Sequence, residues 1–457
     1  MIALSDALSA AGFTTSVVPS FSGEDPVLRT PYRVGTAGAA ALAALGCAVA
    51  ELHVLRGGEP QSVAVSLRAA AASLRSARYL RVNGEAPRVW DPLSGFYAVR
   101  DGWISLHCNF PNHRDAALGV LAAEPSRDAV RAKAAGWQGE ALEDAVHAAG
   151  GCAGFVRTEA EWRAHPQARA VASEPVLRIT RIGAAPPQPL ARHARPLGGV
   201  RVLDLTRVLA GPTCARSLAE HGADVLKITA AHLADSAAIE LDTGIGKLSA
   251  RLDLRDENDR SRLQKLIREG DVFSQSYRPG ALAALGFSPA ALAELRPGIV
   301  CASLCAWGAS GPWAARRGFD SIVQCVSGMA AASGTPEQPA LMPVSAIDYV
   351  SGYLMAFGTV VALYRRAREG GSWHVQVALA RVGQWIAERG VLPEAEWRRA
   401  PLELPDEELA PLLGETDSPA GRIRHLKPVL ELSGTPPHWR RPPVPLGTHP
   451  PEWPERE

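Results

Sequence analysis

From residue 197 onward, short apolar runs alternate with helical stretches, and this alternation constrains the fold more than any other feature of the chain. Residues 199–205 are typical of a buried strand, 213–221 of a helix that ends at Gly222, and 223–228 of the next strand. Further apolar runs follow at 271–273 and 298–304. Strands that alternate with helices favour an open, mostly parallel sheet with helices on both faces and right-handed crossovers. We therefore predict an α/β fold with a Rossmann-like sheet.

Two common nucleotide signatures are missing from this region. The first strand is not followed by Gly-x-Gly-x-x-Gly, and there is no Walker loop ending in Gly-Lys-Ser/Thr. Hydride transfer on a dinucleotide fingerprint and P-loop phosphoryl transfer are therefore both disfavoured.

The composition of the chain limits the classes of molecule that we expect it to bind. Hydrophobic residues make up 47% and charged residues 21% of the 457 residues, and the formal net charge is +1. No global field favours nucleic acid or an anionic membrane, so neither is expected as a partner. The seven cysteines and 12 histidines show no metal-ligand spacing, so we expect no metal and no permanently bound cofactor. Reduced thiols, with no signal-peptide pattern and no apolar run of transmembrane length, predict a cytoplasmic location.

A helix-plus-strand pattern occurs twice. An Ala-rich helix at about 36–55, ended by Gly57-Gly58, precedes a strand pattern at 61–67; another helix at 348–368, ended by Gly370-Gly371, precedes residues 374–379. In this first repeat, Val63 corresponds to Val375, an offset of 312 positions. A second repeat follows along the chain: residues 159–163 recur at 394–398, an offset of 235 positions. A looser echo relates 186–187 to 436–437. This ordered series favours a degenerate duplication over chance repetition of Ala-rich helices.

The second copy lacks most of residues 72–157. That segment contains a predicted hairpin at 97–106, turning at Asp101-Gly102, and a helical tract at 127–149, so we predict a small α+β domain there. The predicted division of the chain is: 1–30, an N-terminal arm; 31–71, the first-copy helix and strand, packed on the large domain; 72–157, the small domain; 158–196, a linker; 197–345, the large α/β domain; 346–390, the second-copy helix and strand; and 391–457, a Pro-rich C-terminal segment.

Asp320 is the main candidate for chemistry. It follows Gly318-Phe319 and precedes an apolar run that predicts a helix. The free N–H groups and positive dipole end of a helix favour an ionised Asp, which we expect to be exposed. A positioned carboxylate can act as a covalent nucleophile toward an activated acyl group. Taken alone, however, the position favours a plain helix cap.

The surrounding motifs change that weighting. In chain order they are residues 197–206 (LGGVRVLDLT), 209–212 (LAGP), 222–227 (GADVLK), 277–280 (YRPG), 307–308 with 311–312 (WG and GP), and 318–320 with 323–324 and 327–328 (GFD, VQ and SG). Together they resemble the class III CoA-transferases, the family that includes formyl-CoA and carnitine CoA-transferases and acyl-CoA racemases. The resemblance is strong over 197–380 and fainter over 31–190 and 425–450, and the order of segments is unusual.

The resemblance implies that Asp320 is the nucleophile that attacks an acyl-CoA thioester, in a ping-pong exchange of CoA with a carboxylic acid. CoA is thereby a substrate, and small carboxylic acids are the other partners. The resemblance places CoA against the turn Val208-Leu209-Ala210 and the loop Tyr277-Arg278-Pro279-Gly280, with Arg278 as a phosphate ligand and Lys247 as a weaker candidate. Members of the family that the chain resembles form interlocked dimers, so we expect a homodimer, in which the two copies complement each other either within one chain or across the dimer.

Three functions remain open. In the racemases of the family that this chain resembles, a His directly before the Asp acts as an acid/base group. This chain has Phe319 at that position, which cannot accept or donate a proton. Asp348, which matches the other racemase carboxylate, is then left alone, and we expect it to cap its helix. An active CoA-transferase is thus favoured over an acyl-CoA racemase or isomerase. A non-catalytic CoA-ester-binding protein is the third reading, because the residues commonly found on the CoA side are replaced by Thr229, Ala230, Ser276 and Ala284.

Overall fold

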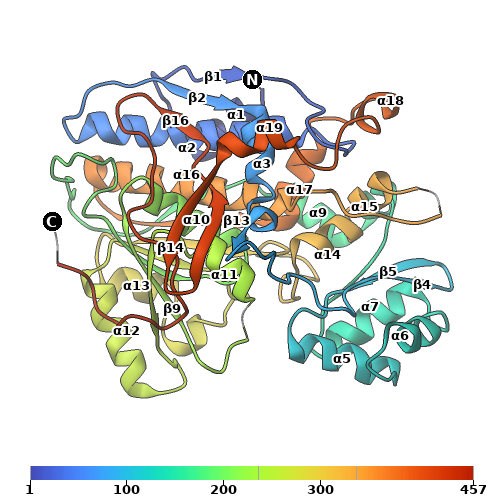
Figure 1. Cartoon of the computed structure of the whole chain (residues 1–457). Coiled ribbons are helices and arrows are strands. Elements are labelled where there is room, and N and C mark those ends of the chain that lie inside the picture. The colour runs from blue at the N-terminus through green and yellow to red at the C-terminus, as the bar shows by residue number, and fades with distance from the viewer. Residues whose placement is uncertain (1, 235, 336, 456–457) are drawn as a thin grey trace.

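A seven-stranded sheet forms the largest domain of the computed structural model, which describes residues 2–234, 236–335 and 337–455 (Figure 1). The strand order is β10-β9-β8-β11-β12-β13-β7. All neighbours are parallel except β7, which runs antiparallel to β13. The strands are β7 (Arg178–Gly183), β8 (Arg201–Leu205), β9 (Asp224–Thr229), β10 (Lys247–Arg251), β11 (Val272–Gln275), β12 (Val300–Cys305) and β13 (Ser372–Ala378). The predicted mostly parallel α/β sheet is confirmed.

Helices cover both faces of this sheet, as predicted. Successive side chains of a strand point to opposite faces. Val202 and Val272 therefore join one core with α10 and α16, whereas their neighbours Leu203 and Phe273 join another with α12 and α13. The helices are α10 (Ala210–Glu220), α11 (Ala237–Thr243), α12 (Glu257–Glu269), α13 (Pro289–Leu295) and α16 (Ala346–Glu369), with a 3-10 turn at Ala283–Leu285.

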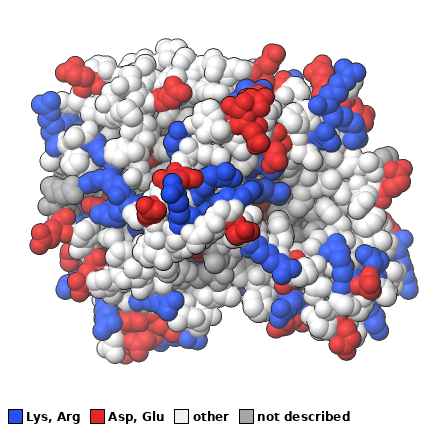
Figure 2. Space-filling view, in the orientation of Figure 1, with Lys and Arg blue, Asp and Glu red and all other residues white. Residues whose placement is uncertain are grey.

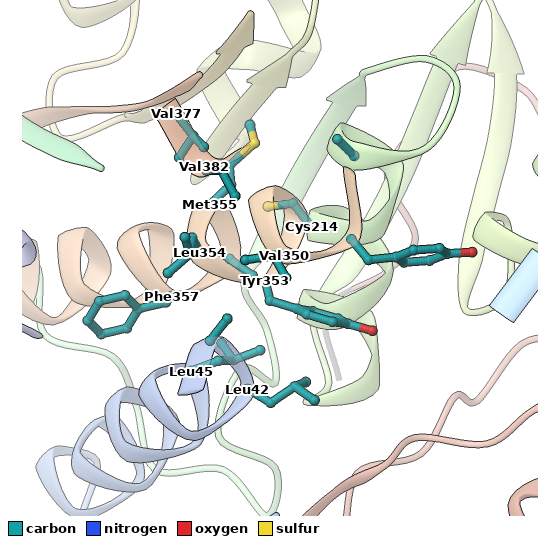
Figure 3. Close-up of a cluster of buried hydrophobic side chains, with 14 of the residues drawn as sticks. Leu42, Leu45, Cys214, Val350, Tyr353, Leu354, Met355, Phe357, Val377 and Val382 are labelled. Atoms are coloured by element: carbon teal, nitrogen blue, oxygen red, sulfur yellow. The ribbon is translucent and has the colours of Figure 1, made fainter. Parts of the chain in front are cut away.

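Two long apolar helices, α2 (Val34–Leu55) and α16, pack against each other in the centre of the protein. Figure 3 shows Leu42 and Leu45 of α2 beside Tyr353 of α16, with α10 close behind. Gly352 allows α10 to approach α16 closely, because a Cβ there would lie 2.5 Å from the backbone oxygen of Ala210. Both helices are long and apolar enough to cross a membrane, but 78% and 100% of their most apolar windows are buried inside the protein. Core packing accounts for this apolar character.

The structure repeats around α2 and α16. β2 (Val63–Ser66), which follows α2, lies between a parallel β1 (Ser20–Ser22) and an antiparallel β16 (Leu430–Leu432). β13, which follows α16, likewise lies between the parallel β12 and the antiparallel β7. Val65 pairs with Leu430, and extending the β13–β7 register by one residue sets the equivalent Val377 opposite Leu177. This shared topology and register supports the predicted duplication.

The small domain has its own core between residues 93 and 155. Its sheet, in the order β4-β5-β6, includes the hairpin that turns at Arg100-Asp101, next to Gly102. Its elements are β4 (Gly95–Val99), β5 (Gly102–Leu106), α5 (Pro111–Leu121), α6 (Arg127–Ala134), α7 (Gly139–Ala148) and β6 (Ala153–Phe155). It is preceded by α3 (Leu67–Ser73), α4 (Ser76–Tyr79) and β3 (Arg81–Val82).

Three segments predicted as an arm, a linker and a Pro-rich tail contain more structure than expected. The arm holds α1 (Ile2–Ala11) and β1; the linker holds α8 (Glu159–Ala164), α9 (Pro166–Ala172) and β7; the C-terminal segment holds α18 (Glu394–Trp397), α19 (Asp406–Leu409), a 3-10 turn at Ala410–Leu412, β14 (Leu413–Ser418), β15 (Gly421–Leu426) and β16. β1, β7 and β14 are short or half-exposed, so they lack the apolar runs that predict a buried strand.

Candidate active site

Asp320 is the first residue of α14 (Asp320–Val326), and its carboxylate accepts hydrogen bonds from two directions. Oδ2 accepts the backbone N–H of Asp348 at 3.0 Å, at the start of α16. Oδ1 accepts the side-chain amide of Gln324, one turn further along α14. That amide is oriented in turn by the backbone N–H of Met342, which donates to Oε1 of Gln324 at 2.8 Å. The carboxylate of Asp320 is therefore held in one orientation.

The carboxylate is also buried, and Asp320 is only 6% exposed. Burial raises the pKa of Asp320 to about 6, although the N–H of Asp348 and the amide of Gln324 favour the ionised form. The expectation of an exposed carboxylate is wrong, because α16 and strands of the small domain pack against α14. The group still ionises below neutral pH, and it does so with little water around it.

Asp348 is the second buried carboxyl group at this point. It is the third residue of α16, which has no side-chain cap hydrogen bond, so the predicted capping role is not found. Burial, and then the negative charge of Asp320, raises the pKa of Asp348 well above its usual range. Of two close carboxyl groups the one with the higher pKa keeps the proton. Asp320 is therefore the first of the pair to ionise, and its charge favours the protonated form of Asp348.

Two neighbouring cavities meet at this pair. The large cavity, of about 700 Å³, is bounded by the turn after β8, the loop after β11, the start of α5 and residues 316–319. The Asp320 chamber, of about 70 Å³, contains Asp320 itself. Val208, Leu209, Phe319 and Asp348 line both. A ligand in the large cavity can therefore present one end to Asp320.

Most of the residues predicted to contact CoA gather around the large cavity, but not all of them. Its lining includes Val208, Leu209, Ala210, Tyr277, Arg278 and Pro279. Gly280 instead lines an adjoining cavity of about 260 Å³, which shares Tyr277 and Pro279 with the large one.

Lys247 lies elsewhere. Its ammonium group is buried, donating to Asp204 at 2.7 Å and to the backbone oxygen of Pro212 at 2.9 Å. A cation paired in this way is not available to a phosphate, so we drop it from the proposed CoA ligands. Asp204 also accepts the backbone N–H of Thr206 at 3.0 Å. Through Asp204, Lys247 thus supports the turn that contains Val208. Val208 has a φ of 67°, a conformation that is costly for a β-branched residue and is found mostly where function requires it.

Four arginines line the large cavity: Arg207, Arg278, Arg316 and Arg317. Burial, and then the nearby charge of Arg278, lowers the pKa of Arg317, so the two guanidinium groups face a common space. Sequence reasoning assigned Arg278 to this task, with Lys247 as a weaker candidate. Figure 2 shows a different band of basic side chains over β14 and β15, where Arg422 is paired with Glu415.

The small domain, which belongs to the first copy, packs against the Asp320 site and covers one side of it. The ring of His107 stacks on that of Phe319, with centroids 3.8 Å apart and an interplanar angle of 3°. Burial lowers the pKa of His107 to about 3 and that of His113, beside it, to about 4, so both imidazoles are neutral. The backbone N–H of Arg157 also donates to the oxygen of Cys325 in α14, at 3.2 Å. Within one chain, the small domain of the first copy therefore meets the candidate nucleophile of the second.

The first copy retains a counterpart of Asp320. Asp25, in Gly23-Glu24-Asp25, accepts the backbone N–H groups of Gly35 at 3.1 Å and Thr36 at 2.8 Å, at the start of α2. With the offset of 312, Thr36 corresponds to Asp348. Asp25 thus has the relation to α2 that Asp320 has to α16, but its neighbouring acid is replaced by a hydroxyl group. Sequence reasoning missed this pair, because Asp25 lies 11 residues before Thr36 whereas Asp320 lies 28 residues before Asp348, so the offset of 312 does not connect the two Gly-x-Asp motifs.

The chain matches CoA-transferase family III over residues 6–188 and again over 197–403. These ranges cover most of the 457 residues, so the protein belongs to that family. The two separate matches also fit a partial duplication. Among the described residues, no group of three or more His, Cys, Asp or Glu side chains is arranged to hold a metal ion.

Individual relatives match part of the chain. It is 35% identical over 211 residues to an acetyl-coenzyme A transferase of Hypoxylon pulicicidum, covering 44% of this chain and 36% of that protein. It is 31% identical over 274 residues to a probable fatty acyl-CoA transferase of Mycobacterium tuberculosis, covering 55% and 69%. The match to the acetyl-CoA:oxalate CoA-transferase of Acetobacter aceti is 33% over 202 residues, covering 41% and 52%. The chain thus spans only about a third to two thirds of these relatives.

Among solved structures, a hypothetical protein from Mycobacterium tuberculosis is 32% identical, with a TM-score of 0.41, covering 44% of this chain and 58% of that one. A CAIB/BAIF family protein from Brucella suis is 28% identical, with a TM-score of 0.40, covering 43% and 56%.

Proposed function

We propose that the protein moves CoA between an acyl-CoA ester and a carboxylic acid through an aspartyl intermediate on Asp320. One observation carries this proposal: the Asp320 carboxylate is buried, held by two hydrogen bonds, and opens on a chamber beside an arginine-lined cavity. Membership of CoA-transferase family III supports it, as do relatives named as CoA-transferases for oxalate and for succinate with glutarate.

The first half of the reaction forms an aspartyl-CoA thioester. A carboxylate oxygen of Asp320 attacks the thioester carbonyl carbon, the C–S bond breaks, and a mixed anhydride and CoA thiolate result. The thiolate then attacks the aspartyl carbonyl carbon, and the original acyl group leaves as a free carboxylate. Burial strips water from the attacking oxygen, and the hydrogen bonds from Asp348 and Gln324 fix its direction.

The second half reverses these steps with another acid. The incoming carboxylate attacks the aspartyl thioester, and CoA thiolate is released again as a second mixed anhydride forms. The thiolate then attacks the acyl carbon of the incoming acid, which yields the new acyl-CoA and restores the Asp320 carboxylate. No proton transfer to carbon is needed, which suits a site where Phe319 stands beside the nucleophile.

CoA would occupy the large cavity. Arg278 and Arg317 can bind its phosphates, which are good partners for guanidinium groups, whereas Arg316 is already paired with Asp144 at 2.6 Å. The turn at Val208 carries the thioester end toward the chamber, because its residues line both spaces. The binding energy of the CoA moiety, far from the reacting bond, is then available to orient the thioester.

Racemisation is the weaker alternative. It needs a base on each side of the α-carbon, and the position before Asp320 is Phe319. His107, whose imidazole lines the Asp320 chamber, has a pKa lowered to about 3 by burial, which makes it a poor proton acceptor.

Steady-state kinetics and deuterium incorporation separate the functions. A transferase predicts parallel double-reciprocal plots for acyl-CoA and acid, no deuterium at the α-carbon in D₂O, and loss of exchange in Asp320→Ala. Deuterium uptake without exchange of acids supports an isomerase. Binding of CoA without either activity supports a non-catalytic protein.

The cytoplasmic location and the homodimer stay proposals. The described thiols are all free, and most of them are buried, as a reducing compartment would allow. Light scattering measures the mass in solution directly.

A further inference from the structure

Arg78 occupies a fixed place at the Asp320 chamber. It belongs to the short helix α4 and lines the chamber together with Asp320. The backbone N–H of Ala77 donates to the hydroxyl oxygen of Tyr349 at 2.9 Å, and the hydroxyl of Ser76 donates to Asp242 at 2.6 Å. Tyr349 directly follows Asp348 in α16. The backbone next to Arg78 is thereby tied to α16, whose Asp348 N–H donates to the carboxylate of Asp320.

Two arginines line this chamber, and they differ in what they bind. Arg75 is already paired: it donates to the backbone oxygens of Pro343 and Leu402 and pairs with Glu403 at 3.0 Å. Arg78 is exposed, and within the described ranges its side chain has no hydrogen bond or ion pair. Its charge is near enough to Asp320 to lower the pKa of that carboxyl group. Arg78 is therefore a positioned cation that can pair with an anionic ligand.

The rest of the chamber is small and largely apolar. Its walls include Val89, Trp90, Leu341, Met342 and Val344. A volume of about 70 Å³ holds roughly five water-sized groups, which suits a short chain and not a long acyl tail. The chamber therefore offers a nucleophile, a few apolar contacts and one available cation.

We infer that the acid exchanged here is a small dicarboxylic acid, one carboxyl group of which reacts at Asp320 while Arg78 pairs with the other. This inference rests on the proposed function, because it concerns the acid that enters the Asp320 chamber. Arg78 comes from the first copy, so the duplication supplies the substrate-selecting residue and the second copy supplies the nucleophile. A monocarboxylic acid of equal length leaves the guanidinium group without an anion.

The test compares succinyl-CoA with butyryl-CoA, two esters of equal chain length that differ in the second carboxylate. The variants are Arg78→Met, Arg78→Lys and, as a control, Arg88→Met, which removes the same charge from an exposed residue nearby that lines none of the cavities described above. The readout is the ratio of kcat/KM for the two esters, with thermal melting to establish that each variant is folded.

Wild type should prefer succinyl-CoA. Arg78→Met should lower the ratio about 10- to 100-fold, as expected for loss of a hydrogen bond between charged groups. Arg78→Lys should restore part of the ratio, and Arg88→Met should leave it unchanged. A wild-type preference for butyryl-CoA, or an unchanged ratio in Arg78→Met, overturns the inference while the proposed function stands. Transfer from neither ester, with no covalent adduct on Asp320, overturns both.

Discussion

At the scale of the residue, Asp320 is governed by a competition between desolvation and hydrogen bonding. Burial raises its pKa to about 6, and the N–H of Asp348 and the amide of Gln324 oppose that rise without cancelling it. The folded state therefore binds this proton more tightly than the unfolded chain does. The contribution of Asp320 to stability is complete below a pH of about 4 and is lost as the pH rises through about 6. The reactive, ionised form is thus the less stable one.

The same pKa predicts how activity depends on pH. With an ionised nucleophile, kcat/KM should rise as the pH increases through about 6 and then reach a plateau. Asp348→Asn should keep this inflection, because Asp320 is the first of the two carboxyl groups to ionise and the backbone N–H of residue 348 is retained. A pH–rate profile of both proteins checks this, and an inflection near 4, or a fall in rate toward pH 7, contradicts it.

Gln324 should act through Asp320. Gln324→Leu removes a donor that favours the ionised carboxylate, so the inflection of the pH–rate profile should move above 6. The backbone N–H of Met342 also loses its acceptor, at a cost in unfolding free energy of about 1–3 kcal/mol. A purely structural role predicts the loss of stability with no shift of the inflection. Combined pH–rate profiles and denaturant titrations distinguish the two.

At the scale of the element, α2 and α16 begin in the same way, but the Asp that accepts their N–H groups has a different role in each case. Each helix start donates backbone N–H groups to an Asp of a Gly-x-Asp sequence. Asp320 is buried against a cavity and has an acidic neighbour, whereas Asp25 is half-buried and has Thr36 in that place. Asp25 therefore caps a helix, which is the role that the position of Asp320 favours when it is considered alone.

This contrast supplies a matched pair of variants. Asp25→Asn loses a charge and one of two acceptors at a helix start, and should reduce the free energy of unfolding by about 0.5–2 kcal/mol with CoA transfer unchanged. Asp320→Asn should abolish transfer by at least about a thousandfold, as expected when a covalent nucleophile is removed. Denaturant titration and a transfer assay on both proteins provide the comparison. Loss of activity in Asp25→Asn would show that the first copy retains catalytic function.

Sequence patterns predicted the elements that are buried on both faces and missed those that are not. Strands such as β12 are nearly continuous apolar runs, so the parallel sheet could be predicted directly. β7 completes that sheet as an edge strand, but it contains the exposed Arg178 and the half-exposed Thr180, so it lacks the apolar pattern of a buried strand. The burial of Asp320 depends on the small domain, which lies more than 160 positions earlier in the chain. The ion pair of Lys247 likewise depends on β10 lying two strands from β8.

At the scale of the whole molecule, the duplication places both halves of the site in one chain. The small domain reaches α14 within the chain, and Gly154 of β6 is close enough that an added Cβ would lie 3.1 Å from Ile322. A homodimer is therefore not required to complete the Asp320 site, whatever the mass in solution.

Complementation tests this arrangement. Gly154→Leu should disturb the docking of the small domain on α14, and Asp320→Ala removes the nucleophile. Because each site is built from one chain, a mixture refolded or co-expressed from these two variants should show no more transfer than the separate proteins. Recovery of a quarter or more of the wild-type activity would mean that sites form between chains.

The covalent intermediate is the most direct test of the central claim. The protein is incubated with an acyl-CoA and then with hydroxylamine, and the peptide that contains Asp320 is examined by mass spectrometry. The account predicts a hydroxamate on Asp320 that also forms in Asp25→Asn and disappears in Asp320→Ala. No adduct with any acyl-CoA, despite measured CoA binding, would contradict it.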